Sequence, residues 1–185
     1  MPKSTQRRQN RVKKINLRDR VFDIPDFPKK GIVFRDITPL LLDPVYFAEA
    51  IRQLVAKAKK LRPNLIVGID SRGFLFGPSV AQKLRVGFVP ARKVNKLLPR
   101  RTVEQTYALE YGTDGVKMHA DSIKPGDRVL IVDDLVATGG TAWATAKLAE
   151  KLGGKVVGLL FLNELAYLKP RKKLKGYKVV SLLKF

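Results

Sequence analysis

The chain has 185 residues, 45% of them hydrophobic, which is enough for one domain with a substantial buried core. It contains no cysteine and a single histidine, His119, which excludes disulfides, cysteine-ligated zinc and a thiol nucleophile and argues against histidine-based sites. The formal net charge is +21, and so basic a chain attracts polyanions and phosphorylated small molecules.

The first predicted element is a basic arm over residues 1–20, with eight lysines and arginines against one acid, Asp19. No apolar periodicity is sustained there, so we expect a flexible or partly helical segment. The positive charge is consistent with non-specific binding of nucleic acid through the arm. It is equally consistent with a general role in keeping the protein soluble. The sequence shows no secretory signal and no apolar run of the roughly 18–20 residues that span a bilayer, so we expect a cytoplasmic protein without membrane contact.

Beyond the arm, residues 31–36 predict a short extended segment or a loop. Residues 44–61 predict a helix with Asp43 as N-cap and Pro44 at its first position. The chain then alternates between short apolar runs and amphipathic segments. This alternation predicts strands at 65–69, 86–91, 129–132, 156–162 and 177–183, helices at 77–84 and 141–152, a strand pair at 106–111 and 116–119, and a basic loop at 93–101. Strands separated by helices favour an α/β fold, with a mostly parallel central sheet flanked by helices.

The most informative stretch runs from residue 129 to residue 141. Four apolar residues predict a buried strand, and Asp133 and Asp134 follow where that strand leaves the sheet. Residues 137–141 then lead into a helix, so their backbone N–H groups, two threonine hydroxyls and the helix dipole can converge on one phosphate. The paired carboxylates suit a ribose, because each carboxylate can accept a hydrogen bond from one of two neighbouring ribose hydroxyls. The stretch therefore predicts a sugar-phosphate site.

Competing motifs do not match this sequence. The 137–141 loop lacks the lysine of a P-loop and is not G-x-G-x-x-G. The segment around Ser71 lacks the first glycine of a nucleophile elbow. The alternative for Asp133 and Asp134 is a solvated strand end with a capping role.

Residues 129–141 resemble the phosphoribosyl-pyrophosphate (PRPP) signature of the type I phosphoribosyltransferases. Further blocks at 25–28, 31–38, 70–77, 92–93 and 109–112, in the same order, are similar to the adenine-specific branch of that family. The resemblance covers residues 21–185, so it implies a phosphoribosyltransferase domain there, with a small N-terminal hood-like segment. It implies a glycosyltransferase of purine salvage that converts adenine and PRPP to AMP and pyrophosphate with Mg²⁺.

The resemblance also implies roles for individual residues. The ribose would be bound by Asp133 and Asp134, and the 5′-phosphate by Ala137, Thr138, Gly139, Gly140 and Thr141. Pyrophosphate would be bound by Asp70, Ser71, Arg72, Arg92, Lys93 and Lys96, with a cis peptide before Ser71. Adenine would be bound by Val33, Phe34, Arg35 and Leu165, and Glu110 and Arg72 would be the catalytic residues. No protein ligand is expected for Mg²⁺, which would be held mainly by PRPP and water.

Each role has a structural alternative. Arg72 is otherwise a surface arginine, residues 92–96 a solvated basic loop, and Phe34 and Leu165 core residues, while His119 is expected to be structural or solvent-facing. The 93–101 loop departs from the family pattern, because it lacks a glycine before the lysine and has a second leucine before Pro99. The resemblance implies a homodimer. A PRPP-sensing regulator that binds nucleic acid on the same fold is the alternative function.

Overall fold

The computed structural model describes residues 15–109 and 112–185. These belong to two compact units, divided between Glu49 and Ala50. In the first unit, the 3-10 helix η1 (Leu17–Arg20) precedes an antiparallel pair of strands, β1 (Phe22–Ile24) and β2 (Phe34–Asp36). Helix α1 (Thr38–Leu42) and the start of α2 (Pro44–Lys59) follow. The predicted hood-like role of this unit and the predicted arm boundary at residue 20 stay predictions.

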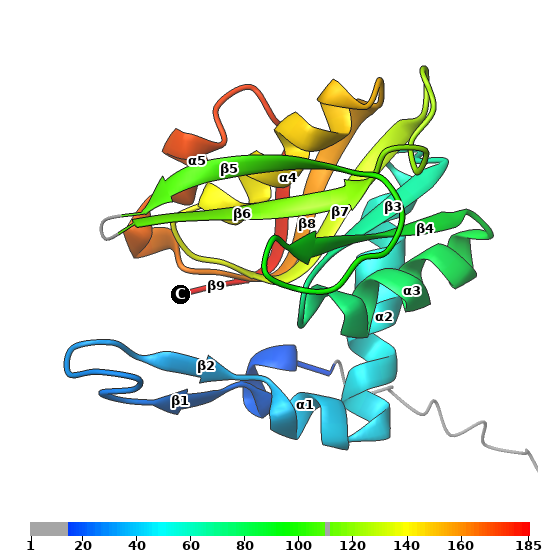
Figure 1. Cartoon of the computed structure of the whole chain (residues 1–185). Helices are drawn as coiled ribbons and strands as arrows, with labels where there is room; N and C mark the ends of the chain where they lie inside the picture. Colours follow the sequence, from blue (N-terminus) through cyan, green and yellow to red (C-terminus); the bar gives the residue numbers. More distant parts are fainter. Residues whose placement is uncertain (1–14, 110–111) are drawn as a thin grey trace, which may run out of the picture. The chain divides into compact units, whose positions relative to one another are not determined.

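The predicted helix at 44–61 is confirmed as α2, which ends two residues earlier (Figure 1). Asp43 caps it, because the backbone N–H groups of Val45 and Tyr46 donate to Asp43 Oδ1 at 3.0 and 3.3 Å. No helix within the described ranges combines the length and apolar character needed to cross a membrane.

The second unit is built on a seven-stranded sheet in the order β5-β6-β4-β3-β7-β8-β9 (Figure 1). Strands β3, β4, β7, β8 and β9 are parallel, whereas the β5–β6 hairpin joins the sheet antiparallel to β4. Its strands are β3 (Leu65–Ile69), β4 (Gly87–Lys93), β5 (Thr102–Leu109), β6 (Gly112–His119), β7 (Arg128–Val136), β8 (Lys155–Glu164) and β9 (Val179–Lys184). The connecting helices are α3 (Gly73–Leu84), α4 (Gly140–Lys151), η2 (Ala166–Leu168) and α5 (Pro170–Lys173). The mostly parallel α/β sheet expected from the sequence is confirmed.

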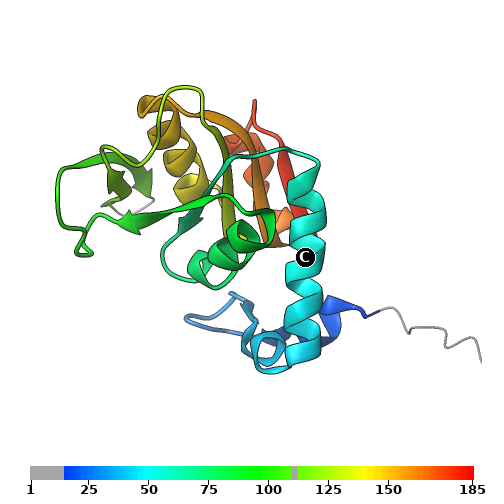
Figure 2. The same ribbon diagram turned by 90° about the vertical axis from the view of Figure 1, so that its right-hand side faces the viewer.

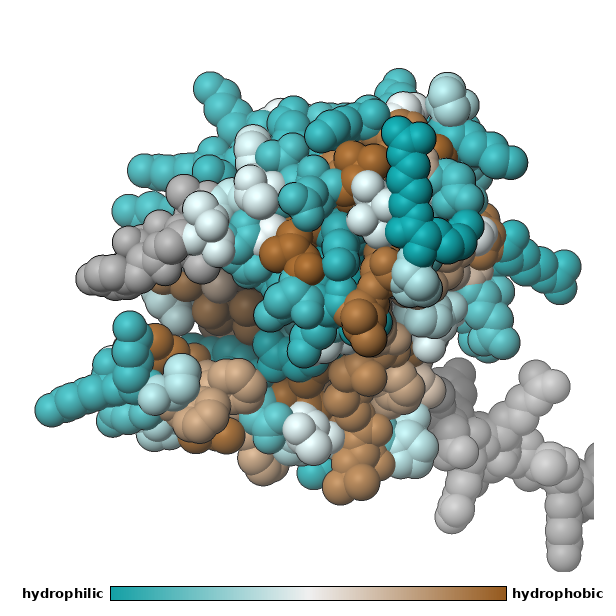
Figure 3. Space-filling view, in the orientation of Figure 1, coloured by the Kyte–Doolittle hydropathy of each residue, from teal (hydrophilic) through white to brown (hydrophobic). Residues whose placement is uncertain are grey.

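Helices α3 and α4 pack on opposite faces of this sheet (Figure 2). Side chains alternate between the two faces along each strand. Val67 and Ile131 join the core under α4, whereas Phe88 packs beside Gly77 of α3. Because both faces are covered, the central strands are continuous apolar runs, which is why the sequence revealed them. The surface in Figure 3 shows mainly hydrophilic side chains over this unit, as the basic composition predicts.

Strand β7 is longer than the sequence indicates. Asp133 and Asp134 were expected just after the strand, but β7 continues to Val136. The reason is that β8 runs alongside and pairs Asp133 with Phe161 and Val136 with Glu164. The two carboxylates therefore sit on strand backbone, and their side chains alternate between the sheet faces.

The core contains one amide that has no protein hydrogen-bond partner among the described residues. Asn163 on β8 is completely buried, and both its Oδ1 and Nδ2 are unsatisfied. We expect Asn163→Val to raise the free energy of unfolding by about 1–3 kcal/mol, because valine carries no amide to desolvate and suits a strand. Thermal denaturation measures the change.

Asn64→Val is the matched control for this substitution. The Asn64 side chain donates to Asp127 Oδ1 and accepts from the Arg128 backbone N–H, at 3.2 and 2.7 Å, so its loss destabilises the chain. A melting temperature for Asn163→Val at or below that of the parent contradicts the prediction.

Candidate active site

Three neighbouring parallel strands, β4, β3 and β7, end at the same edge of the sheet. Asp70 follows β3, Arg92 lies near the end of β4 and Asp133 lies near the end of β7. Open α/β sheets bind ligands at this edge. The fold therefore brings residues predicted for ribose and for pyrophosphate to one edge, although they are far apart in the sequence.

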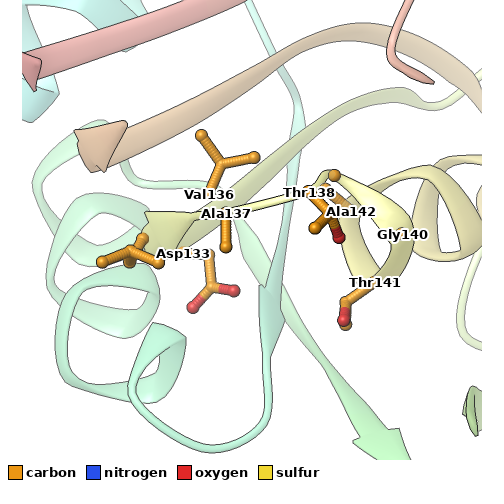
Figure 4. A pocket seen from close by; sticks show the side chains of 9 residues that line it. Asp133, Val136, Ala137, Thr138, Gly140, Thr141 and Ala142 are labelled. Atoms are coloured by element: carbon orange, nitrogen blue, oxygen red, sulfur yellow. The ribbon is translucent and has the colours of Figure 1, made fainter. Parts of the chain in front are cut away.

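The loop between β7 and α4 encloses a cavity of about 210 Å³, lined by Asp133 and residues 135–142 (Figure 4). Gly139 is the N-cap of α4, with a φ of 90°, a conformation that glycine adopts without steric cost. The first N–H groups of a helix have no partner within the helix, and together with the helix dipole they favour an anion. Thr138 and Thr141 add hydroxyls at the start of α4, and the Asp133 carboxylate lies on the strand side of the same cavity (Figure 4). The cavity thus has the chemistry of a phosphate site.

Both glycines of this loop are closely packed. A Cβ atom on Gly140 would lie 2.9 Å from Cδ2 of the Tyr107 ring, and one on Gly139 would lie 3.2 Å from Cγ of Leu174. The two glycines thus let β5 approach the loop on one side, and let α5 and its C-cap residue Leu174 approach it on the other. Sequence reasoning missed Tyr107, because no local pattern signals which strand packs on the loop.

The adjacent carboxyl groups of Asp133 and Asp134 are unfavourable in their charged forms, because both are removed from water and they repel each other. Asp134 is only 4% exposed, and its backbone N–H donates to Asp133 Oδ1 at 2.9 Å. Burial and the neighbouring Asp134 charge raise the pKa of Asp133 well above its usual range. Burial also raises the pKa of Asp134, although the nearby Arg72 guanidinium opposes that rise, with Nε 3.0 Å from Asp134 Oδ2. A ligand whose hydroxyl groups donate hydrogen bonds to these carboxylates would compensate for the free-energy cost of removing them from water.

The loop from β3 to α3 contains the predicted cis peptide, between Asp70 and Ser71. Arg92 Nε donates to Asp70 Oδ2 at 3.2 Å across the adjacent strand ends. The carboxyl of Asp70 therefore holds the Arg92 side chain, while Arg72 pairs with Asp134. Two guanidinium groups thus lie at the strand ends, where a polyanionic ligand would need them.

Lys93 and Lys96 differ in their surroundings. Lys93 Nζ donates to Tyr107 Oη at 3.0 Å and to the carboxylate of Asp114. Lys96 is exposed in the turn after β4, where its backbone N–H donates to the Lys93 carbonyl. Sequence reasoning missed Asp114, whose role emerges only once β5 and β6 are paired.

The other predicted residues fall in several places. Val33 precedes β2, whereas Phe34 and Arg35 lie on β2 in the first unit, where Arg35 pairs with Asp23. Leu165 is buried in the second unit directly after β8. Glu110 lies outside the described residues. The His119 ring Nε2 lies 2.6 Å from the Pro99 carbonyl oxygen, a contact at the base of the 93–101 loop.

Comparison with known proteins shows the family of this chain. The family profile of the phosphoribosyl transferase domain matches residues 46–182, so the chain belongs to the phosphoribosyltransferase family. The chain is 53% identical over 171 residues to the adenine phosphoribosyltransferase of Carboxydothermus hydrogenoformans, an alignment that covers 92% of this chain and all of that protein. Within its family, the chain therefore belongs with the adenine phosphoribosyltransferases.

Solved structures support the same placement. The adenine phosphoribosyltransferase of Thermoanaerobacter pseudethanolicus superposes with a TM-score of 0.88 at 51% identity, covering 91% of this chain and 98% of that one. The Saccharomyces cerevisiae enzyme, solved with adenine and an iminoaltritol bisphosphate, gives a TM-score of 0.83 at 40% identity, covering 90% and 96%. These relatives give no support to the regulator alternative.

Proposed function

We propose that this chain transfers the 5-phosphoribosyl group of PRPP to adenine, giving AMP and pyrophosphate in purine salvage. The observation that carries the proposal is the cavity between β7 and α4, which joins a helix N-terminus to the Asp133 carboxylate at a strand end. Residues 137–141 bind the 5′-phosphate through backbone N–H groups and hydroxyls. Asp133 and Asp134 accept hydrogen bonds from the ribose hydroxyls.

Pyrophosphate leaves from the opposite side of the ribose from the attacking base, through an oxocarbenium-like centre. Arg72 and Arg92, with the 70–71 segment and Lys96, bind the departing phosphates by charge-assisted hydrogen bonds. Lys93 adds a further positive charge near the departing phosphates, and its hydrogen bonds to Tyr107 and Asp114 hold its ammonium group in place. The contribution of the protein is mainly positioning and electrostatic stabilisation.

Magnesium fits this arrangement as an ion that arrives with PRPP. Within the described ranges, no three acidic or histidine side chains gather as a metal-binding cluster. The carboxylates of Asp133 and Asp134 would accept hydrogen bonds from the ribose hydroxyls and from water molecules, and those oxygens would in turn hold the ion. When bound, Mg²⁺ neutralises charge on the leaving pyrophosphate.

The adenine base contacts Phe34, with Val33 and Arg35 beside it in the sequence. The Phe34 ring packs edge to face on the Phe27 ring, with the ring centroids 5.4 Å apart. Leu165 supplies an apolar surface in the second unit. Glu110 handles a proton on the purine imidazole ring. The 93–101 loop closes during turnover and excludes water from PRPP.

A direct assay tests the function. Purified chain is supplied with PRPP, Mg²⁺ and adenine, guanine or hypoxanthine, and nucleotide formation is measured. We expect AMP from adenine and at least tenfold slower reaction with the oxopurines, because the two classes present different hydrogen-bonding edges. An Asp133→Asn, Asp134→Asn double variant, expected to make no AMP, controls for contaminating activity. Turnover with an oxopurine but not adenine contradicts the proposal.

We also propose a homodimer in the cytoplasm. Leu42 and Val45 are 82% and 57% exposed, and such apolar side chains suit a subunit contact. Light scattering of the full chain, with Leu42→Ser as the variant, measures the association state.

Nucleic-acid binding through residues 1–20 is measured separately, by salt titration with and without the arm.

A further inference from the structure

We propose that Tyr107 is a positioning residue, whose hydroxyl orients the Thr141 hydroxyl of the phosphate loop and links it to Lys93 and Asp114. This inference rests on the proposed function, because it assigns a role in binding the 5′-phosphate. It adds a residue outside the phosphate-loop sequence to the phosphate site.

The geometry places Tyr107 at the centre of a four-residue network. Its Oη lies 2.6 Å from Thr141 Oγ1, 2.8 Å from Asp114 Oδ2 and 3.0 Å from Lys93 Nζ. The Tyr107 side chain belongs to β5, is 7% exposed and packs its ring against Gly140 of the loop. The hydroxyl is therefore held in place from the ring side and by three polar partners.

Counting protons fixes the direction of each hydrogen bond. Lys93 has only donors, and it donates to both Tyr107 and Asp114. Tyr107 has one proton, which it donates to Asp114, a carboxylate that only accepts. The remaining bond must then run from Thr141 to Tyr107. Without phosphate, the Thr141 proton thus points towards the hairpin.

Charge keeps this arrangement in place at neutral pH. Burial works against the charged forms of Asp114 and Lys93, but their mutual contact and the Tyr107 hydroxyl outweigh it, which lowers the pKa of Asp114 and raises the pKa of Lys93. Asp114 therefore remains an acceptor and Lys93 a donor. Tyr107 is held between two charged groups that cannot exchange roles.

A bound phosphate reverses the orientation at Thr141. Its oxygens only accept at the loop, so Thr141 turns its proton to the phosphate. Tyr107 can then turn its own proton from Asp114 to Thr141 Oγ1, while Lys93 continues to hold Asp114. No covalent bond changes, and only two hydroxyl protons rotate. Binding of phosphate thereby changes the hydrogen bonding between Tyr107 on β5 and Asp114 on β6. These two strands form the hairpin whose connecting residues include Glu110.

The test compares Tyr107→Phe with Tyr177→Phe in the full chain. Both substitutions remove one hydroxyl that donates to a carboxylate, but Tyr177 donates to Glu150, near the opposite end of α4 from the phosphate loop. Affinity for ribose 5-phosphate is measured by titration calorimetry. We expect it to weaken about fivefold or more in Tyr107→Phe, as for the loss of one hydrogen bond, and to be unchanged in Tyr177→Phe.

Kinetics and a double-variant cycle separate positioning from simple loss of stability. We expect the KM for PRPP to rise in Tyr107→Phe with the KM for adenine unchanged. Combining it with Asp114→Asn should weaken ribose 5-phosphate binding by less than the product of the two single effects, because both act through one hydroxyl. Independent effects, or equal losses in Tyr107→Phe and Tyr177→Phe, overturn the inference.

The outcome is distinguishable from failure of the proposed function. A parent chain that makes AMP, with unchanged ribose 5-phosphate affinity in Tyr107→Phe, overturns the positioning role alone. A parent chain that makes no AMP, while Tyr107→Phe still weakens ribose 5-phosphate binding, overturns the proposed reaction and supports the positioning role. A parent chain that neither makes AMP nor binds ribose 5-phosphate overturns both.

Discussion

Asp133→Asn is expected to fold more stably than the parent at neutral pH while losing about 10- to 150-fold in affinity for PRPP. The loss in affinity follows from removing a charged acceptor for ribose hydroxyls, each such bond being worth about 1.5–3 kcal/mol. The gain in stability follows from removing one of two adjacent, desolvated carboxyls, which we expect to contribute about 1–3 kcal/mol. Thermal melting and PRPP titration measure the two effects on the same samples.

The stability effect has a defined pH dependence. Because the pKa of Asp133 is raised in the folded chain, its protonated form stabilises the fold fully below the unfolded-state pKa, about 4. That contribution is lost as the pH rises through the raised pKa. The asparagine side chain does not titrate, so the advantage of Asp133→Asn should be small at pH 4 and grow towards pH 8. An advantage that is constant with pH, or largest at pH 4, contradicts the prediction.

Arg72→Met is expected to lower kcat/KM for PRPP by about 100- to 1,000-fold, the range for removal of one electrostatic contact to a developing charge. Its guanidinium is the cation beside the buried Asp134 carboxylate, with Nε at 3.0 Å. Removing it leaves two carboxyls without that cation and also weakens the site for the leaving pyrophosphate. Steady-state kinetics with varied PRPP measure the loss.

Two further variants define the role of Arg72. Arg72→Lys keeps the charge but not the planar guanidinium, so it should recover part of the activity. Lys147→Met removes a cation from an exposed ion pair with Glu150 on α4 and should leave the kinetics unchanged. Equal activity of Arg72→Met and the parent rules out the assigned role.

Much of the fold was predictable because its signals are local. The buried strand at residues 65–69 was predicted with its observed bounds, since a parallel strand covered on both faces is a continuous apolar run. The Asp43 cap was also predicted correctly, because capping depends on neighbouring residues. The end of β7 was not, because its extension to Val136 depends on pairing with β8.

The sequence by itself predicted a sugar-phosphate site, because the order of acids, small residues and threonines from Asp133 to Thr141 indicates that chemistry whichever elements surround it. The 137–141 loop is the part of that stretch proposed to bind the phosphate. Only the tertiary structure decided which groups act on that loop. Arg72 reaches Asp134, and Tyr107 reaches Thr141, because β3 lies beside β7 and the β5–β6 hairpin lies near α4. Periodicity specifies how each segment folds, whereas contacts between distant segments depend on strand order, which no local pattern encodes.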